Sequence, residues 1–488
     1  MRPSACSRDP SAGAADGLPD AVIVGAGPNG LAAAIELARA GRSVLVCERA
    51  ETVGGGARTA ELTLPGYRHD VCSAIHPLAV GSPFLRALPL ADHGLELLEP
   101  EVQCAHPLDG GRAAAVYRSI DQTAAELGPD SGAYTALIRP FAEGWDELAS
   151  TVLGAPRPPR HPVAAARFAL AGLRGASGLA KSKFRTDAAR AIMAGMGAHS
   201  MRPLNRPPTA AFGLVLLTLG HAAGWPVAGG GSQSISDAMA GYLRSLGGEI
   251  RTGFEVRSLA DLPQARALLF DVTPRQLVAI CGDALPGRYT ASLRRFRYGT
   301  GIFKLDYALS GPVPWTAEAP RRAGTVHLGG TLTEIAAAEA ATVAGRHPER
   351  PFVLVGQQSL VDPGRAPAGK HTLWAYCHVP NGSPVDMTAA IERQIERFAP
   401  GFGDVVLERA ARGPADLEAE NPNYIGGDIN GGAADLRQVL ARPVLRITPY
   451  STPNPRVFLC SSSTPPGGGV HGMCGYHAAR AALRTALR

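Results

Sequence analysis

The chain has 488 residues, of which 45% are hydrophobic and 18% are charged. This apolar content excludes a wholly disordered chain and a small disulfide-stabilised scaffold, and the length predicts two or three structural units at roughly 150 residues per domain. The formal net charge of +6 is mild for this size, so we expect no nucleic-acid partner.

The N-terminal residues 1–19 are small and polar and contain no apolar core segment. They predict a disordered leader rather than a secretory signal. The longest strongly apolar stretch, residues 209–219, is far shorter than the ~20 residues that span a bilayer. We therefore expect a cytoplasmic protein, either free in water or bound peripherally to a membrane.

A strand–helix–strand unit follows the leader. An apolar run at residues 21–24 leads into the turn Gly25-Ala26-Gly27-Pro28-Asn29-Gly30, a helical pattern up to residue 39 and a second apolar run at 43–47. In this context the glycines are typical of a dinucleotide site: Gly25 allows the tight turn, Gly27 lets the backbone approach a pyrophosphate, and Gly30 permits close helix–strand packing. Glu48 ends the second strand, where a carboxylate binds ribose hydroxyls and repels a 2′-phosphate. The unit predicts FAD or NAD rather than NADP.

The rest of the chain alternates helical and strand patterns. Residues 86–224 have a mainly helical pattern, residues 232–246 predict a capped helix, and residues 249–256 a returning strand. Further strands are expected at 301–309, 352–355 and 372–378, followed by a helix at 387–398. The pattern as a whole predicts an α/β fold.

The closing segment repeats the strand–turn–helix pattern. Apolar residues 457–460 precede a glycine-rich turn at 464–475 and a final helix. A helix N-terminus with glycines at positions of close approach suits the negative charge of a reduced flavin ring. A second glycine cluster, residues 54–56, follows Glu48 closely and indicates backbone packed against a larger cofactor.

These blocks together resemble the FAD-dependent phytoene desaturase and carotenoid isomerase-like oxidoreductases, and residues 421–429 are similar to the branch named after pyridine nucleotide-disulfide oxidoreductases. The resemblance implies a discontinuous Rossmann-like FAD-binding domain (20–85, 225–280 and 440–488) and a mixed α+β substrate domain (86–224 and 281–439). It implies FAD as the cofactor. The expected cofactor-binding residues are Gly25, Gly27, Pro28, Asn29, Gly30, Glu48, Arg49, Gly55, Gly56, Arg58, Val256, Gly469, Gly472 and Met473.

No catalytic acid–base pair stands out. His471, Tyr424, Asp428 and Tyr450 are weak candidates in expected loops, with structural roles as the alternative. The histidines and cysteines show no metal-ligand spacing within a helix-like run, and the eight cysteines form no C-x-x-C pair, so we expect no metal and no redox dithiol. G-x-S-x-G is absent, which disfavours a hydrolase.

Residues 156–206 contain ten basic residues and one acidic residue, mixed with apolar side chains. This segment predicts either a solvated basic face or a peripheral membrane contact. The expected function is hydride transfer from an apolar polyene or isoprenoid-like substrate to flavin N5, in a desaturase or isomerase reaction. Two alternatives remain: a flavin amine oxidase acting on a small substrate, and a non-catalytic FAD-binding interaction protein. The oligomeric state stays open.

Overall fold

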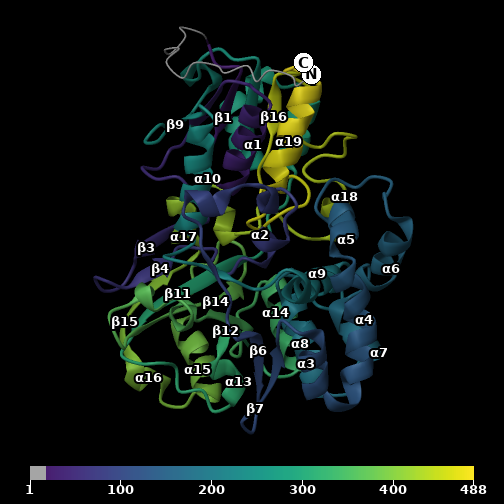
Figure 1. The fold of residues 1–488 in the computed structure, drawn as a ribbon, viewed down its shortest axis with the longest axis vertical. Helices are drawn as coiled ribbons and strands as arrows, with labels where there is room; N and C mark the ends of the chain where they lie inside the picture. The colour runs from purple at the N-terminus through teal and green to yellow at the C-terminus, as the bar shows by residue number, and fades with distance from the viewer. Residues whose placement is uncertain (1–17) are drawn as a thin grey trace, which may run out of the picture.

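The computed structural model describes residues 18–488, so the predicted leader at 1–19 lies almost wholly outside the described residues. The described chain forms two layered parts, seen at the top and bottom of Figure 1. The first and last elements of the described chain, β1 (Ala21–Val24) and α19 (Met473–Arg484), both lie in the upper part, and most of the middle of the chain forms the lower part.

The upper part is built on a five-stranded parallel sheet in the order β16-β10-β1-β2-β9. The strands are β1 (Ala21–Val24), β2 (Val44–Cys47), β9 (Glu249–Arg251), β10 (Ala267–Phe270) and β16 (Val457–Leu459). Strands β1, β2, β10 and β16 are buried throughout, as their continuous apolar runs require of a parallel sheet covered on both faces.

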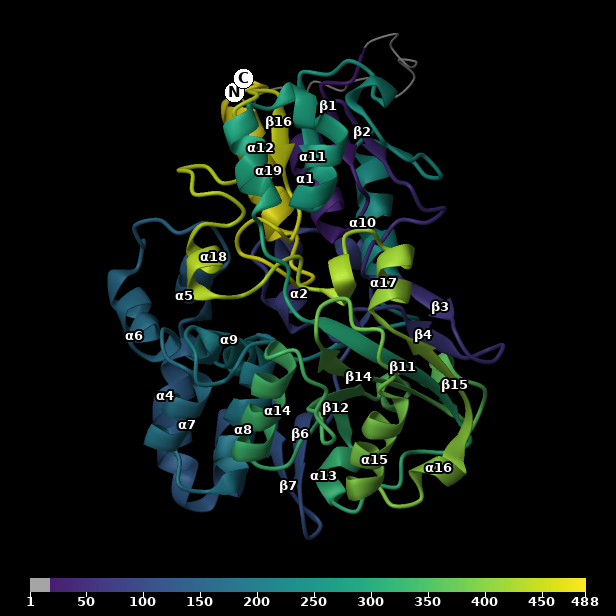
Figure 2. The same ribbon diagram turned by 180° about the vertical axis from the view of Figure 1, so that it is seen from behind.

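Helices cover the two faces of this sheet. One face, with Ile23 and Val46, packs on α1 (Pro28–Arg39), α10 (Gln233–Ser245) and α19 (Met473–Arg484). The other face, with Val22 and Leu45, packs on α11 (Pro274–Cys281) and α12 (Gly287–Arg294), which Figure 2 shows from behind. The upper part is therefore a Rossmann-like three-layer unit assembled from separate stretches of the chain.

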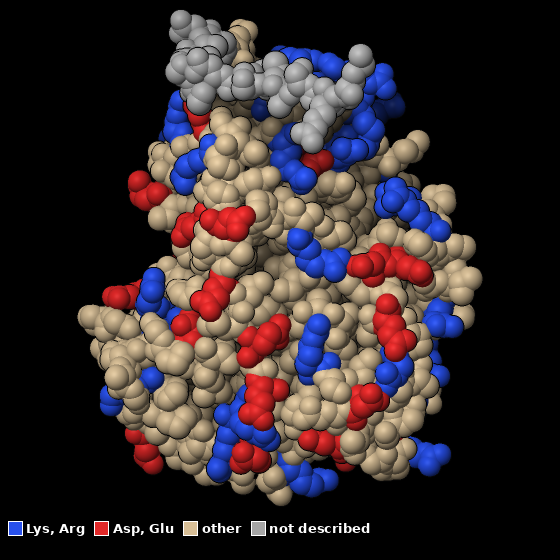
Figure 3. Space-filling view, in the orientation of Figure 1, with Lys and Arg blue, Asp and Glu red and all other residues tan. Residues whose placement is uncertain are grey.

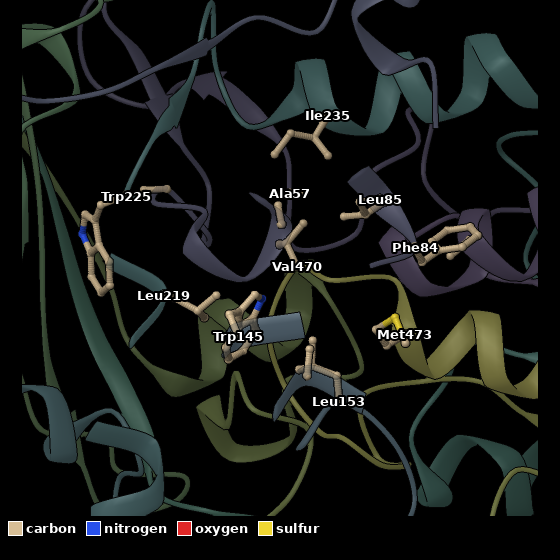
Figure 4. Close-up of a cluster of buried hydrophobic side chains, with 14 of the residues drawn as sticks. Ala57, Phe84, Leu85, Trp145, Leu153, Leu219, Trp225, Ile235, Val470 and Met473 are labelled. Atoms are coloured by element: carbon tan, nitrogen blue, oxygen red, sulfur yellow. The ribbon is translucent and has the colours of Figure 1, made fainter. Parts of the chain in front are cut away.

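The two ends of the chain meet in this unit. Helix α19 packs along α1 so closely that a Cβ on Gly475 would lie 1.8 Å from the carbonyl oxygen of Asn29. Figure 4 shows a core next to this contact, where Val470 and Met473 of the C-terminal segment lie among side chains such as Phe84 and Ala57. The glycine turns near the two ends are thereby held side by side.

The lower part is built on a seven-stranded mixed sheet in the order β15-β11-β14-β13-β12-β6-β7, in which only β12 and β6 pair in parallel. The strands are β6 (Val102–Leu108), β7 (Arg112–Val116), β11 (Gly301–Leu309), β12 (Ala323–Leu328), β13 (Val353–Gly356), β14 (His371–Val379) and β15 (Val406–Arg412). Helices α15 (Thr388–Phe398) and α16 (Phe402–Val405) pack on one face through Ile391, Ile395 and Phe402.

A helical group covers the other face and one side of the lower part (Figure 1). It consists of α3 (Ile120–Glu126), α4 (Ser131–Glu143), α5 (Trp145–Val152), α6 (Pro162–Gly172), α7 (Ala176–Lys183), α8 (Asp187–Ala198), α9 (Thr209–Ala222) and α14 (Leu332–Val343). Among the described residues, no helix combines the length and the apolar character that crossing a bilayer requires.

Three predictions of local structure need correction. Strands β6 and β7 lie within the stretch whose pattern is mainly helical, because each contains a single β-branched residue, Val102 and Val116, and so gives little strand signal. Strand β12 lies in the region 297–379, which has a strand-rich pattern, but is not itself among the predicted strands, and β15 lies outside every predicted strand. Strand β9 ends at Arg251, so the predicted strand over 249–256 is too long and Val256 lies in the loop that follows.

Candidate cofactor and substrate cavity

One cavity of about 820 Å³ runs from the Rossmann-like unit into the lower part. Its size lies near the upper end of the range for cofactor and small-molecule sites, about 300–1,000 Å³. Eleven of the fourteen predicted cofactor-binding residues line it: Gly25, Gly27, Pro28, Asn29, Glu48, Arg49, Gly55, Gly56, Arg58, Val256 and Gly469. Segments from both ends of the chain therefore face the same space.

The first glycine turn joins β1 to α1 at one end of this cavity. Gly25 has a φ of +102°, a conformation that suits glycine. A Cβ on Gly30 would lie 1.9 Å from the carbonyl oxygen of Gly25, so only glycine allows the helix to start this close to the strand. The N-terminus of α1 thus lies at the cavity wall with its positive dipole end, which suits phosphate groups; Pro28 has no N–H, and the N–H of Gly30 donates to Asp271.

Glu48 holds two loops together at the end of β2. Its Oε2 accepts a hydrogen bond from the backbone N–H of Ala26 at 2.7 Å, and its Oε1 accepts one from Ala50 at 2.9 Å. A carboxylate has about four acceptor sites, so each oxygen keeps capacity for a further donor such as a ribose hydroxyl. The side chain is positioned at the cavity wall by the backbone itself.

Asp271, directly after β10, is a site residue that no sequence motif indicates. Its Oδ2 accepts a hydrogen bond from the backbone N–H of Gly30 at 2.8 Å, and a Cβ on Gly27 would lie 2.8 Å from that oxygen. Burial raises the pKa of Asp271 to about 7; the Gly30 hydrogen bond opposes this rise and the nearby Glu48 adds to it. The carboxyl therefore exchanges a proton near neutral pH, beside the turn expected to face a pyrophosphate.

The second glycine loop closes over the first. A Cβ on Gly55 would lie 3.1 Å from the Cα of Gly27, so the two backbones are almost in contact. Arg58 donates to the carbonyl oxygen of Gly55 at 3.0 Å and forms an ion pair with Glu420 at 2.9 Å. This arginine therefore fixes the loop in place.

The C-terminal glycine turn contributes Gly469 and His471 to the cavity wall. Gly472 and Met473 do not line it. A Cβ on Gly472 would lie 3.0 Å from that of Ala32, and Met473 is buried in the hydrophobic core shown in Figure 4. These two residues hold α19 against α1 rather than facing the cavity.

His471 organises the turn itself. Its Nδ1 accepts a hydrogen bond from the backbone N–H of Met473 at 3.0 Å, and its Nε2 lies 3.2 Å from the carbonyl oxygen of Gly467. Burial lowers the pKa of His471 to about 4. The ring is therefore neutral near pH 7, and its two nitrogens are occupied in holding the start of α19.

The other three weak catalytic candidates differ in position. Tyr424 lines the cavity next to Gly56, and burial raises its pKa well above 10. Asp428 lies outside the cavity and accepts hydrogen bonds from the backbone of Gly299 and Asn430 at 2.7 and 2.8 Å. Tyr450 is also outside and stacks on His477 at 5.5 Å. Only Tyr424 and His471 of the four candidates face the cavity.

The far end of the cavity is mainly apolar. Its aliphatic and aromatic wall includes Phe168, Leu173, Phe212, Val215, Leu216 and Leu440. Trp374 and Tyr376 of β14 add a T-shaped pair with ring centroids 5.0 Å apart. Trp225 is held by a hydrogen bond from its Nε1 to the hydroxyl of Thr325 at 2.8 Å. No sequence pattern points to any of these residues, because they come from several separate elements.

Comparisons with known proteins show what the sequence is similar to. Residues 23–88 match the family model of the NAD(P)-binding Rossmann-like domain. The chain is 27% identical to pyridine nucleotide-disulfide oxidoreductase domain-containing protein 2 of Mus musculus, over 95% of this chain and 93% of that protein. It is 26% identical to the neurosporene-forming phytoene desaturase of Rhodobacter capsulatus, over 94% and 93% respectively.

Solved structures share the fold. An oxidoreductase from Methanosarcina mazei superposes with a TM-score of 0.63 at 16% identity, covering 95% of this chain and 99% of that one. A redesigned putrescine oxidase gives a TM-score of 0.61 at 18% identity, covering 95% and 98%. The chain thus shares its overall fold with an oxidoreductase and with an amine-oxidising enzyme. By sequence, the chain is similar over most of its length both to pyridine nucleotide-disulfide oxidoreductase domain-containing protein 2 and to a phytoene desaturase.

Proposed function

We propose that the protein is an FAD-dependent oxidoreductase that removes hydride from a C–H bond of an apolar, polyene or isoprenoid-like substrate. The observation that carries this proposal is the single cavity that joins the dinucleotide-binding turns to an apolar chamber. Bound FAD supplies the hydride acceptor, at N5 of its flavin ring. The relationship to a phytoene desaturase supports the substrate class.

The residues present fit FAD. The positive dipole end of α1 suits the pyrophosphate. Glu48 retains acceptor capacity for a ribose diol, and the close backbones of Gly27 and Gly55 leave the wall free of side chains. The chain's own residues then bind and orient both molecules and exclude water. Trp374, Phe212 and Leu216 form an apolar wall against which an extended hydrocarbon packs.

An amine oxidase is the second candidate, and the Trp374–Tyr376 pair is the observation that favours it. Two aromatic rings at 5.0 Å in a cavity wall suit a cation–π contact with an ammonium group. The carboxylates that line the cavity count against it: Glu48, Glu255, Asp271 and Glu420 belong to the end with the glycine turns. Within residues 18–488, the apolar chamber has no acidic side chain in its wall to neutralise an amine.

Anaerobic mixing separates these functions. The purified, flavin-loaded protein is mixed without oxygen with a solubilised polyene or with a small diamine, and the flavin absorbance is followed. Bleaching by the polyene supports the proposal. Bleaching by the diamine alone establishes the amine oxidase. Flavin that neither compound reduces, in protein that dithionite does reduce, contradicts both and leaves a non-catalytic flavoprotein.

We also propose that the mouth of the apolar chamber faces a lipid surface. Seven of the twelve large apolar side chains that are strongly exposed lie on α6 with its C-cap and on the segment from α18 (Leu436–Leu440) to residue 447. They are Val163, Leu170, Leu173, Leu436, Leu440, Leu445 and Ile447. Both elements also line the cavity. Exposed apolar patches at a cavity mouth mark contact with a membrane or an apolar partner.

Charge adds to this surface. None of the ten basic residues between 156 and 206 forms an ion pair with an acidic group in the described chain, and the exposed ones, such as Arg160, Arg167 and Lys181, can contact anionic lipids. Two of the apolar residues in this segment, Leu179 and Phe184, are buried and do not contribute. Figure 3 shows that basic side chains also gather at the upper end of the molecule. Positive charge alone therefore does not distinguish the cavity mouth, whereas the exposed apolar residues do.

Sedimentation with vesicles tests the lipid contact. The wild-type protein should sediment with vesicles that contain anionic lipid, and added salt should weaken the binding. The double substitution Leu170→Glu and Leu445→Glu should abolish it. Leu407→Glu is the matched control, because Leu407 is 48% exposed on β15 and lies outside the cavity. Equal binding by both variants would refute the proposed surface.

A further inference from the structure

A buried cluster of cysteine and histidine lies behind the apolar chamber. Cys104 and His106 occupy alternate positions on β6, so their side chains project from the same face of the sheet. Strand β12 pairs in parallel with β6, with Thr325 opposite Cys104, which brings His327 to the same face. The three side chains are buried, and one potential ligand atom from each lies within 4.8 Å of the others.

The separations match those of a tetrahedral metal centre. The Sγ of Cys104 lies 3.6 Å from the Nε2 of His106 and 3.5 Å from the Nδ1 of His327. A zinc ion with Zn–S of about 2.3 Å and Zn–N of about 2.05 Å holds sulfur and nitrogen ligands about 3.6 Å apart at the tetrahedral angle. The sulfur-to-nitrogen distances in this cluster are thus already those expected of zinc ligands.

Hydrogen bonds within the cluster cannot fully satisfy its thiol and imidazole groups. One thiol carries one proton, so it donates to only one of the two facing nitrogens, and the other ring nitrogen must donate to sulfur, a weak acceptor. The Nδ1 of His106 has no hydrogen-bond partner among the described residues.

We propose that Cys104, His106 and His327 bind a thiophilic transition-metal ion, with Zn²⁺ as the expected ion. Three protein ligands leave the fourth tetrahedral position to a small non-protein ligand such as water. Cysteine with two histidines is a donor set that suits zinc or copper rather than magnesium or calcium. The site adds to the proposed oxidoreductase function and does not depend on it.

Two neighbouring residues support the site. Gly195 of α8 lies against both rings, and a Cβ there would be 2.4 Å from the Cε1 of His106, so only glycine lets the helix cover the cluster. His199 lines the cavity, and its Nε2 lies 3.0 Å from the Nε2 of His327. A metal on Nδ1 of His327 makes its Nε2–H the donor in this contact, so the ion would fix the tautomer of His199 at the chamber wall.

Metal analysis of the full-length protein tests the proposal. The protein is produced in zinc-supplemented medium and purified without chelator, and its metal content is measured by inductively coupled plasma mass spectrometry. We expect about one zinc per chain. Cys104→Ser and His327→Gln should reduce the content at least tenfold. Cys377→Ser is the matched control, since Cys377 is a buried free cysteine of β14 in the same sheet, and it should keep the metal.

A second measurement covers variants that fail to fold. Wild-type protein in which Co²⁺ replaces the bound ion should show a thiolate-to-cobalt charge-transfer band and tetrahedral ligand-field bands. Copper in place of zinc would retain the site but overturn the assignment of the ion. Wild-type protein that takes up neither zinc nor cobalt, or a folded Cys104→Ser variant with undiminished metal, would overturn the proposal and leave a thiol–imidazole hydrogen-bond cluster.

Discussion

Replacing Gly475 by alanine tests whether the two chain ends form one structural unit. The new Cβ would lie 1.8 Å from the carbonyl oxygen of Asn29 and 2.8 Å from the backbone nitrogen of Ala33, where ordinary contact begins at 3.4 Å. Because both neighbours are backbone atoms, no side-chain rotation relieves the overlap. Helices α1 and α19 must move apart by about 1.5 Å, and overpacking of this kind costs typically 1–3 kcal/mol.

We expect a loss of stability near the upper end of that range, about 3 kcal/mol. For a unit of roughly 200 residues this lowers the thermal midpoint by about 6–12 °C. Flavin retention should fall as well, since α1 begins at the cavity wall and the turn before α19 contributes Gly469 and His471 to that wall. The assay is thermal unfolding with a flavin-content measurement on the same sample.

Gly178→Ala is the matched control. Gly178 lies in α7, and a Cβ added there would meet no atom within 4 Å, so alanine should stabilise the helix by up to about 1 kcal/mol. A Gly475→Ala protein with the thermal midpoint and flavin content of the wild type would refute the close packing of α1 and α19.

Three further predictions concern the cavity. Glu48→Ala removes the acceptor of two backbone amides and should lower the unfolding free energy by about 1–3 kcal/mol. It should also weaken FAD binding at least tenfold, as measured by equilibrium dialysis. Undiminished affinity for FAD would contradict a role of Glu48 in cofactor binding. Asp271 has its pKa raised to about 7, so the folded state holds an extra proton between about pH 4 and pH 7 and stability falls as pH rises through that window. Asp271→Asn should remove this pH-dependent part of the unfolding free energy, which is at most about 4 kcal/mol. Unfolding measured at about pH 5 and about pH 8 tests this prediction. An unchanged pH dependence in the variant would count against a titrating Asp271. Trp374→Ala should slow flavin reduction by a polyene about tenfold or more and leave FAD binding unchanged, because the substitution removes only part of the chamber wall. The rate is measured by stopped-flow absorbance. An unchanged rate would rule out contact between the substrate and Trp374.

Local patterns are sufficient to predict the dinucleotide-binding part. The turn at Gly25–Gly30 and the acid Glu48 lie within one strand–helix–strand unit, so chain connectivity alone places them together. The C-terminal glycine turn predicts a helix start, and α19 begins at Met473. The family resemblance implies that both turns serve one domain.

The chamber cannot be predicted in the same way. Trp225, Trp374 and Tyr376 meet only because β14 and the segment before β8 (Val227–Ala228) converge on the cavity, and nothing local distinguishes them from other core aromatics. The Cys104 cluster needs the β6–β12 register, which strand patterns do not specify. Asp271 has one usable signal, an acidic residue directly after a buried parallel strand, where ligand sites of α/β sheets lie.

The most direct test of the central claim is a crystal structure of the protein with its cofactor, together with the FAD content of the crystallised sample. We predict about one FAD per chain, with its pyrophosphate at the start of α1, its ribose at Glu48 and its flavin ring beside Gly469. Protein that refuses FAD, or a bound dinucleotide that contacts the first glycine turn while the C-terminal turn lies far from it, would contradict this assignment.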